Sequence, residues 1–181
     1  PETVEAVAAY LGVSAEGEER RVARLACAAG ATVAYHRARY EGLGSCRAAH
    51  LVAGGGKECP WGCLGFGDCV RACEFDAIHL DENGLPVVDE AKCTACNACV
   101  AACPRNLFSL QPLRHRLWVA CSSRAKDEQA LAACAVACTG CGRCAADAPE
   151  GLITMRDNLP HINYDHNEQA HRNIIARCPT G

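Results

Sequence analysis

The spacing of the cysteines constrains this chain more than any other feature. Residues 93–104 read CTACNACVAACP, in which three cysteines stand two residues apart, a fourth follows three residues later, and a proline comes next. In proteins such a run binds one four-iron, four-sulfur cube through its first three cysteines and a second cube through its fourth. Zinc sites instead pair two Cys-x2-Cys knuckles across a longer loop. The run therefore predicts iron–sulfur clusters.

A second, looser run of four cysteines precedes it in a loop that is longer than usual. Glu74 follows its last cysteine, where proline is common. Crossed pairing predicts one cluster on Cys59, Cys63, Cys69 and Cys103, and another on Cys73, Cys93, Cys96 and Cys99. The alternative is that the stretched loop binds zinc by itself.

The C-terminal part repeats this pattern with gaps. Three cysteines follow the same spacing at 138, 141 and 144, and a sister run should end in Cys178-Pro179. The same spacing places the ligands of one cluster at positions that hold no cysteine: Ala148, Glu168, His171 and Ile174. We therefore predict that this part keeps one cluster and fills the other site with protein, its ligands being Cys138, Cys141, Cys144 and Cys178. Glu168 and His171 could bind another metal, but a solvated helix face is the favoured alternative.

Four of the sixteen cysteines lie outside these runs: Cys27, Cys46, Cys121 and Cys134. One hypothesis is a fourth cluster that joins the N-terminal segment to the C-terminal part, and it predicts that replacing Cys27 and Cys46 removes the iron of one cube. The alternative is a set of buried structural thiols, with a zinc site or a disulfide as further possibilities. The chain is thus expected to bind three to four [4Fe-4S] clusters.

The other elements follow from hydrophobic periodicity and turn signals. We predict helices over 2–11, from about 127, and over 165–177, and strands over 21–27 and 117–120. Asn83-Gly84 and Asp157-Asn158 mark two hairpins, 77–88 and 152–162. The expected fold class is α+β, with tandem bacterial ferredoxin-like 2[4Fe-4S] modules after an N-terminal α/β extension. The expected division is an extension over 1–56, a two-cluster module over 57–112 and a one-cluster module over 113–181.

Composition and charge exclude several functions. The formal charge is −3 with neutral thiols, and each oxidised cluster with four thiolates adds about −2. No basic stripe offsets this charge, so nucleic acid is not an expected partner. The sequence shows no secretory signal and no apolar run of about 20 residues. Because it begins without Met, we expect it to be a fragment of a longer protein. It also shows no nucleophile–base pair, phosphate loop or dinucleotide fingerprint, so we expect no active site of its own.

Several segments resemble the B subunit of the Rnf complex. They are ECPWGCLGFGDCVRACEFDAIH over 58–79, NGLPVVDEAKC over 83–93, SCRAA over 45–49, CPRNL over 103–107 and VACSS over 119–123. The resemblance implies a polyferredoxin subunit of a membrane-bound, ion-pumping ferredoxin:NAD+ oxidoreductase. Such a subunit takes electrons from soluble reduced ferredoxin and relays them to the other subunits, on the cytoplasmic side of the inner (plasma) membrane.

Members of that family usually begin with a membrane helix and a further four-cysteine domain, and neither is in this sequence. Contact with the membrane is therefore expected only through missing segments or partner subunits. The alternative is a relay subunit of a soluble oxidoreductase complex. Ferredoxins are commonly acidic, so the candidate docking residues are basic: Arg37, Arg39, Arg47, Arg114, His115 and Arg116.

Overall fold

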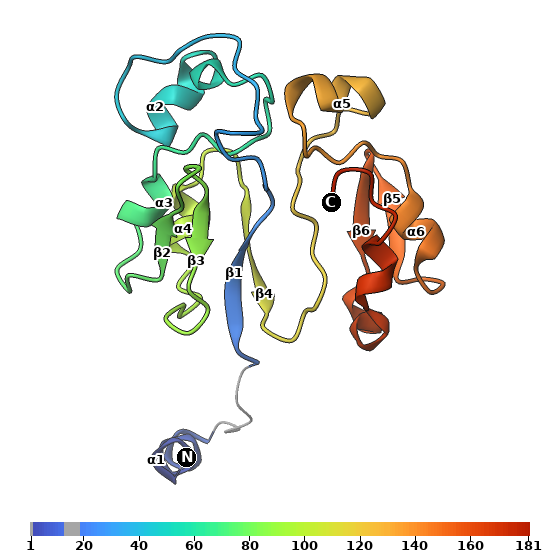
Figure 1. Ribbon diagram of the computed structural model, residues 1–181. Coiled ribbons are helices and arrows are strands. Elements are labelled where there is room, and N and C mark those ends of the chain that lie inside the picture. The colour runs from blue at the N-terminus through green and yellow to red at the C-terminus, as the bar shows by residue number, and fades with distance from the viewer. Residues whose placement is uncertain (1, 13–18) are drawn as a thin grey trace.

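β1 (Arg21–Leu25) and β4 (Phe108–Pro112) form one of three two-stranded antiparallel sheets in this computed structural model, which describes residues 2–12 and 19–181 (Figure 1). The register pairs Arg21 with Pro112 and Leu25 with Phe108. Val22 and Ala23 are both fully buried. Because successive side chains of a strand point to opposite faces, β1 is covered on both faces at this point. The strand predicted near residue 21 is thus formed, and its partner lies more than 80 residues away along the chain.

The first hairpin joins β2 (Ile78–Leu80) to β3 (Pro86–Val88) through Asn83-Gly84, as predicted. The Asp81 carboxylate accepts hydrogen bonds from the N–H groups of Asn83 and Leu85, at 2.9 and 2.8 Å. Two short helices stand beside this hairpin, α3 (Asp68–Arg71) and α4 (Ala98–Ala102), and each begins in a cysteine run. Their shared core consists of Ala23, Cys69, Ile78, Cys99 and Phe108.

The second hairpin joins β5 (Ile153–Arg156) to β6 (Leu159–Ile162). Its two turn residues, Asp157 and Asn158, both have positive φ, at 49° and 63°, which is the backbone of a type I′ turn. α5 (Asp127–Ala133) begins where the sequence predicts a helix, and α6 (Arg143–Asp147) begins within the third cysteine run and contains Cys144. The core beneath this hairpin consists of Leu152, Ile153, Ile162, Ala170 and Ile174.

Two predicted elements are wrong. Residues 117–120 form no strand, because Leu117 and Val119 pack as side chains against the core of the second hairpin without pairing to a strand edge. The last predicted helix is two short 3₁₀ segments, η2 (Tyr164–Gln169) and η3 (Arg172–Ile175), separated by extended backbone at His171. Asn163 caps the first of them by accepting from the Asp165 N–H at 3.1 Å, in the role expected of Asp165.

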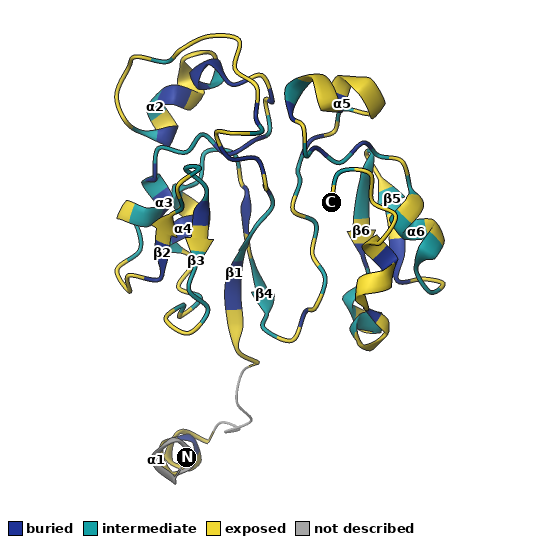
Figure 2. Cartoon of the chain, viewed as in Figure 1, coloured by how far each residue is buried: buried dark blue, intermediate teal, exposed yellow. Residues whose placement is uncertain are grey.

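Three N-terminal elements complete the chain: α1 (Glu2–Leu11), α2 (Cys46–Leu51) and η1 (Ala53–Gly56). α1 is the helix predicted over 2–11, and Gly12 with φ +65° ends it. Figure 2 shows buried residues gathered where the loops of the two hairpin regions meet, while the outer faces of α5 and α6 are exposed. The helices within residues 2–12 and 19–181 are too short or too polar to span a bilayer.

The segment after β4 is fixed to η2. The rings of His115 and Tyr164 stack with centroids 3.6 Å apart and planes 4° from parallel. The Tyr164 hydroxyl lies 3.1 Å from the Gln111 side-chain oxygen and donates to the Leu117 carbonyl at 3.0 Å. Asn167 adds a bond to the Arg114 carbonyl at 3.0 Å. We call these contacts the clamp, because they hold the linker against the C-terminal part.

Candidate iron–sulfur sites

Fifteen of the sixteen cysteines line four hollows in the structure, and Cys141 lies near the cysteines of one of them. All sixteen are free thiols. We name site I for Cys46, Cys63, Cys69 and Cys103; site II for Cys73, Cys93, Cys96 and Cys99; site III for Cys138, Cys141, Cys144 and Cys178; and site IV for Cys27, Cys59, Cys121 and Cys134.

A single metal ion does not fit these groups. Across the described ranges 2–12 and 19–181, no three His, Cys, Asp or Glu side chains stand close enough to hold one ion. Tetrahedral zinc needs its sulfurs about 2.3 Å from the metal. Four cysteines that line one shared hollow suit a larger group with four points of attachment, which is the donor set of a cubane cluster.

Site II contains the four cysteines that crossed pairing predicts. They line a hollow of about 310 Å³ together with Ala77, Ile78 and Leu110. The Ala77 N–H donates to the Cys73 sulfur at 3.4 Å. The backbone turns tightly around this hollow, with positive φ at Ala95 and Asn97. Cys99 is buried and Cys96 is exposed, so one corner of the site faces solvent.

Site I differs from the sequence prediction in one cysteine. Cys46, not Cys59, lines the hollow of about 330 Å³ with Cys63, Cys69 and Cys103. Burial raises the pKa of the Cys63 thiol to about 11 and that of the Cys69 thiol to about 12. These thiols must therefore lose protons when they bind metal.

Asp68 explains why Cys46 reaches site I. Its carboxylate accepts from the Ser45 hydroxyl and from the Arg47 N–H, both at 3.0 Å. These bonds fix the first turn of α2 beside α3, and Cys46 and Cys69 each follow directly on a bonded residue. Burial raises the pKa of Asp68, but the bonds from Arg47, Cys46 and Ser45 outweigh burial, and the net shift is downward.

Backbone hydrogen bonds of Tyr35 place Cys59 at site IV. The Glu58 N–H donates to the Tyr35 carbonyl at 2.9 Å, and the Tyr35 N–H donates to the Ala133 carbonyl at 3.1 Å. Cys59 and Cys134, the next residues along each segment, therefore face the same hollow of about 300 Å³. The placement of two cysteines thus differs from the predicted sets: Cys59 lies with Cys27, Cys121 and Cys134, and Cys46 lies with Cys63, Cys69 and Cys103.

Two cations lie inside the region between sites I and IV. The Lys57 side chain is 6% exposed, and its ammonium donates to the carbonyls of Ala29 and Cys63. The half-buried Arg105 guanidinium donates to the carbonyls of Cys59 and Gly62, at 2.8 and 2.7 Å. Within the described part of the chain neither cation has a carboxylate partner. Neither residue is predicted from the sequence. The pattern that could have indicated them is a lysine and an arginine that stand two residues from a cysteine run.

Site III is more open than the others. Cys138, Cys144 and Cys178 line an apolar hollow of about 720 Å³ between the segment 117–121 and the second hairpin. Cys121, which lines site IV, also borders this hollow. Burial raises the pKa of the Cys144 thiol, and the nearby Cys141 and Cys178 thiols add to the increase. Cys141 itself is exposed. The structure thus brings together the four cysteines that the spacing predicts.

The four positions without cysteine have been absorbed by ordinary protein. Ile174 is 1% exposed in the core of the second hairpin, and Ala148 packs against that core. Glu168 and His171 are exposed, which agrees with a solvated face. The prediction that protein fills this position is confirmed for Ile174 and Ala148 by their packing.

One of the six predicted docking residues is wrong. His115 is buried in the clamp and cannot meet a partner. The other five are exposed, but two of them already form ion pairs, Arg39 with Glu41 and Arg114 with Glu19.

Comparison with known proteins agrees with the cysteine sites. Residues 61–110 match the family described as the 4Fe-4S dicluster domain. That span holds seven cysteines, Cys63, Cys69, Cys73, Cys93, Cys96, Cys99 and Cys103. Two clusters with four ligands each need an eighth, which the structure supplies from Cys46.

Three relatives, each named as the B subunit of its complex, match nearly the whole chain. The chain is 38% identical, over 96% of its length, to the B subunit of the Na(+)-translocating ferredoxin:NAD(+) oxidoreductase complex of Acetobacterium woodii. It is 40% identical, over 98%, to that of the proton-translocating ferredoxin:NAD(+) oxidoreductase complex of Clostridium ljungdahlii. It is 33% identical, over 91%, to that of the ion-translocating oxidoreductase complex of Methanosarcina acetivorans. The chain spans 52%, 63% and 62% of these relatives, respectively.

Proposed function

Because this chain is a homologue of the B subunit of Rnf-type ferredoxin:NAD+ oxidoreductases and carries multiple [4Fe-4S] clusters, we propose that it relays electrons within such a complex. The proposed donor is soluble reduced ferredoxin, and the proposed acceptors are other subunits of a membrane-bound, ion-pumping assembly. The chain would lie peripherally on the cytoplasmic side of the inner (plasma) membrane. It would reach the membrane only through segments outside this sequence or through partner subunits.

The packing of sites I and II in one core carries this proposal. Cys69 and Cys99 are both buried there, with Cys73, Cys93 and Cys103 packed against them. Bound [4Fe-4S] clusters supply one-electron redox chemistry. The protein's own part is to hold the ligands in apolar surroundings and to donate N–H groups to sulfur, which tunes the potential. The Ala77 and Leu107 N–H groups do so at Cys73 and Cys103, each at 3.4 Å.

We further propose that the domains are tandem ferredoxin-like modules, over 57–112 and 113–181, after an extension over 1–56. Each module has a hairpin and a short helix that begins within a cysteine run, which supports the repeat. The pairing of β1 with β4 indicates that the extension is built into the first module and is not a separate body.

Anaerobic stopped-flow reduction tests the proposal. Mixing the reconstituted chain with reduced ferredoxin should bleach its visible absorbance and produce the EPR signal of reduced clusters. A chain that dithionite reduces but ferredoxin does not would contradict the proposed donor. The proposed membrane assembly would be contradicted if the complete protein, purified by affinity from its own cells, brought down a soluble oxidoreductase instead of membrane subunits.

A further inference from the structure

We propose that site IV binds a fourth [4Fe-4S] cluster through Cys27, Cys59, Cys121 and Cys134, and that this cluster lies at the junction between the dicluster domain and site III. The inference rests on the proposed electron-transfer function, which it deepens by naming a site and its position. Site IV lies outside the span that matches the dicluster family, apart from lining residues that it borrows from that span.

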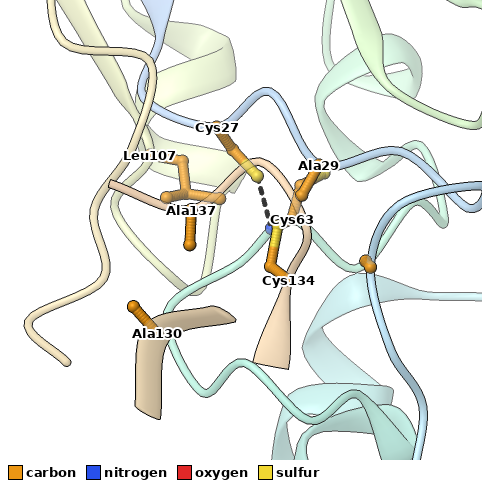
Figure 3. Packing of buried hydrophobic residues seen from close by; sticks show 8 residues of the cluster. Cys27, Ala29, Cys63, Leu107, Ala130, Cys134 and Ala137 are labelled. Carbon is orange, nitrogen blue, oxygen red and sulfur yellow. Dashed lines mark hydrogen bonds between the residues drawn. The ribbon is translucent and has the colours of Figure 1, made fainter. Parts of the chain in front are cut away.

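Site IV resembles the two sites of the dicluster domain in size and surroundings. Its hollow of about 300 Å³ compares with about 330 Å³ at site I and about 310 Å³ at site II. Cys27, Cys59 and Cys134 are each less than 10% exposed. The remaining lining is apolar or small: Ala28, Ala29, Gly62, Ala120, Val136 and Ala137, with Ser122 and Ser123. Figure 3 shows Cys27 and Cys134 with two of these residues, the buried Ala29 and Ala137.

The ligands of site IV come from four segments that the backbone holds together. Cys27 follows β1, Cys59 precedes α3, Cys121 lies in the extended linker, and Cys134 ends α5. An antiparallel bridge joins Ala34 to Cys134, and the Ser122 hydroxyl donates to the Trp61 carbonyl at 3.1 Å. Four segments that are distant in the sequence thus meet at their cysteines. A group that all four cysteines bind explains this packing.

Single hydrogen bonds connect site IV to its neighbours on both sides. The Cys63 N–H of site I donates to the Cys27 sulfur of site IV at 3.4 Å (Figure 3). The Cys138 N–H of site III donates to the Cys121 sulfur of site IV at 3.5 Å. Since sites I and II share a core, the four sites follow one another in the order II, I, IV, III.

The buried cations provide an independent indication of negative charge at this place. Burying an ammonium without a counter-ion is costly. Lys57 and Arg105 have only carbonyl partners in the described part of the chain. Four of these five carbonyls belong to residues that line sites I and IV, and the fifth is that of Gly54. A cluster with four thiolates carries about −2, and one such cluster on each side supplies the missing counter-charge.

Iron and sulfide counting on the anaerobically reconstituted 181-residue chain tests the site. The expected content is about sixteen irons and sixteen sulfides per chain, four for each of four cubes. About twelve irons would overturn the proposal. So would twelve irons with one zinc, which would make site IV a zinc site. This measurement needs no variant and so does not depend on how a mutant folds.

Paired substitutions test which cysteines share the cluster. Cys27→Ala with Cys59→Ala should remove about four irons, because both residues belong to site IV. Cys27→Ala with Cys46→Ala should remove about eight, because Cys46 belongs to site I. A loss of eight irons in the Cys27/Cys59 variant with a loss of four in the Cys27/Cys46 variant would overturn the assignment. Full iron content in the Cys27/Cys59 variant would also overturn it. Cys121→Ala with Cys134→Ala repeats the first test from the other side of the site.

The outcome is separable from that of the proposed function. If the chain holds sixteen irons but ferredoxin cannot reduce it, the site IV proposal stands and the proposed donor is refuted. A chain with twelve irons that ferredoxin reduces rapidly keeps the donor and loses site IV.

Discussion

Asp68 supplies the contact that takes Cys46 into the dicluster domain. It has no ligand role of its own, but its carboxylate binds the first turn of α2 through Ser45 and Arg47. Arg71 reinforces this arrangement by donating to the Gly44 carbonyl at 3.1 Å. At the scale of single residues, the composition of site I therefore depends on a carboxylate that lines the same hollow as the four cysteines.

We predict that Asp68→Ala releases Cys46 and lowers the iron content by about four per chain, while site II keeps its cluster. Colorimetric iron analysis and the EPR signal of the remaining clusters measure this. Glu41→Ala is the control, because Glu41 is exposed and pairs with the exposed Arg39. Equal iron in the two variants would show that Asp68 does not position the ligand.

Lys57 gives a second prediction at this scale. Replacing its buried charge by Lys57→Met should lower the reduction potentials of sites I and IV by tens of millivolts, since about 60 mV in a one-electron couple corresponds to a tenfold change in equilibrium. Removing a nearby positive charge disfavours the more negative, reduced state. EPR-monitored redox titration measures the shift. The exposed Lys126→Met is the control, and an equal shift in both variants would refute the role of Lys57.

At the scale of elements, η1 ends in three consecutive glycines, and the last of them packs closely against neighbouring backbone. Gly54, Gly55 and Gly56 all have positive φ, between 65° and 71°. A Cβ at Gly56 would stand 2.1 Å from the Ala38 carbonyl oxygen, which is backbone and cannot rotate away. The run lets the chain turn between α2, with Cys46 of site I, and Cys59 of site IV.

We expect Gly56→Ala to lower the free energy of unfolding by roughly 2–4 kcal/mol. Left-handed alanine costs about 1–2 kcal/mol, and overpacking at this contact adds about 1–2 kcal/mol, within its usual range of about 1–3 kcal/mol. Gly44→Ala is the control: nothing lies within 4 Å of its Cβ and its φ is not left-handed, so its effect should stay within about 0.5 kcal/mol. Denaturant titration of the reconstituted chain compares them. A difference under about 0.5 kcal/mol would mean that this approach of backbones is not maintained in solution.

At the scale of the whole molecule, the clamp and site IV are two places where the C-terminal part meets the rest. The clamp is polar and aromatic, with the His115–Tyr164 stack at its centre. Burial lowers the pKa of His115; Arg114, Arg21 and Arg24 also lower it, while Glu19 opposes them. The folded protein therefore holds the neutral imidazole.

This gives a pH dependence of known sign. Because the pKa of His115 is lower in the folded than in the unfolded chain, its contribution to stability is present above about pH 6.5 and is lost as the pH falls through the folded value. His115→Phe keeps a ring on Tyr164 and removes the titration. Denaturant unfolding at about pH 7.5 and about pH 5.5 should show a smaller loss of stability in the variant than in the wild type. Equal losses would assign the acid sensitivity elsewhere.

Features that depend on contacts within a few residues could be predicted from the sequence, and features that depend on contacts between distant segments could not. The hairpins at Asn83-Gly84 and Asp157-Asn158, and the ligand sets of sites II and III, come from short signals within a few residues or from a repeated spacing. The exchange of Cys46 and Cys59 is decided by Asp68 and by the backbone around Tyr35, which belong to other segments. No local pattern distinguishes those two cysteines, and nearness in sequence favours the wrong one.

Because the ligands of different sites alternate along the chain, the sites become complete in a fixed order during synthesis. Site II takes all its cysteines from residues 73–99, so it is complete soon after that stretch leaves the ribosome. Site IV needs cysteines as far apart as 27 and 134. Between these two moments Cys27 and Cys59 wait without their partners, in the state in which thiols are most open to oxidation. Biogenesis of this chain is therefore most vulnerable to oxygen at its junction, and anaerobic conditions or a chaperone would protect that interval above all others.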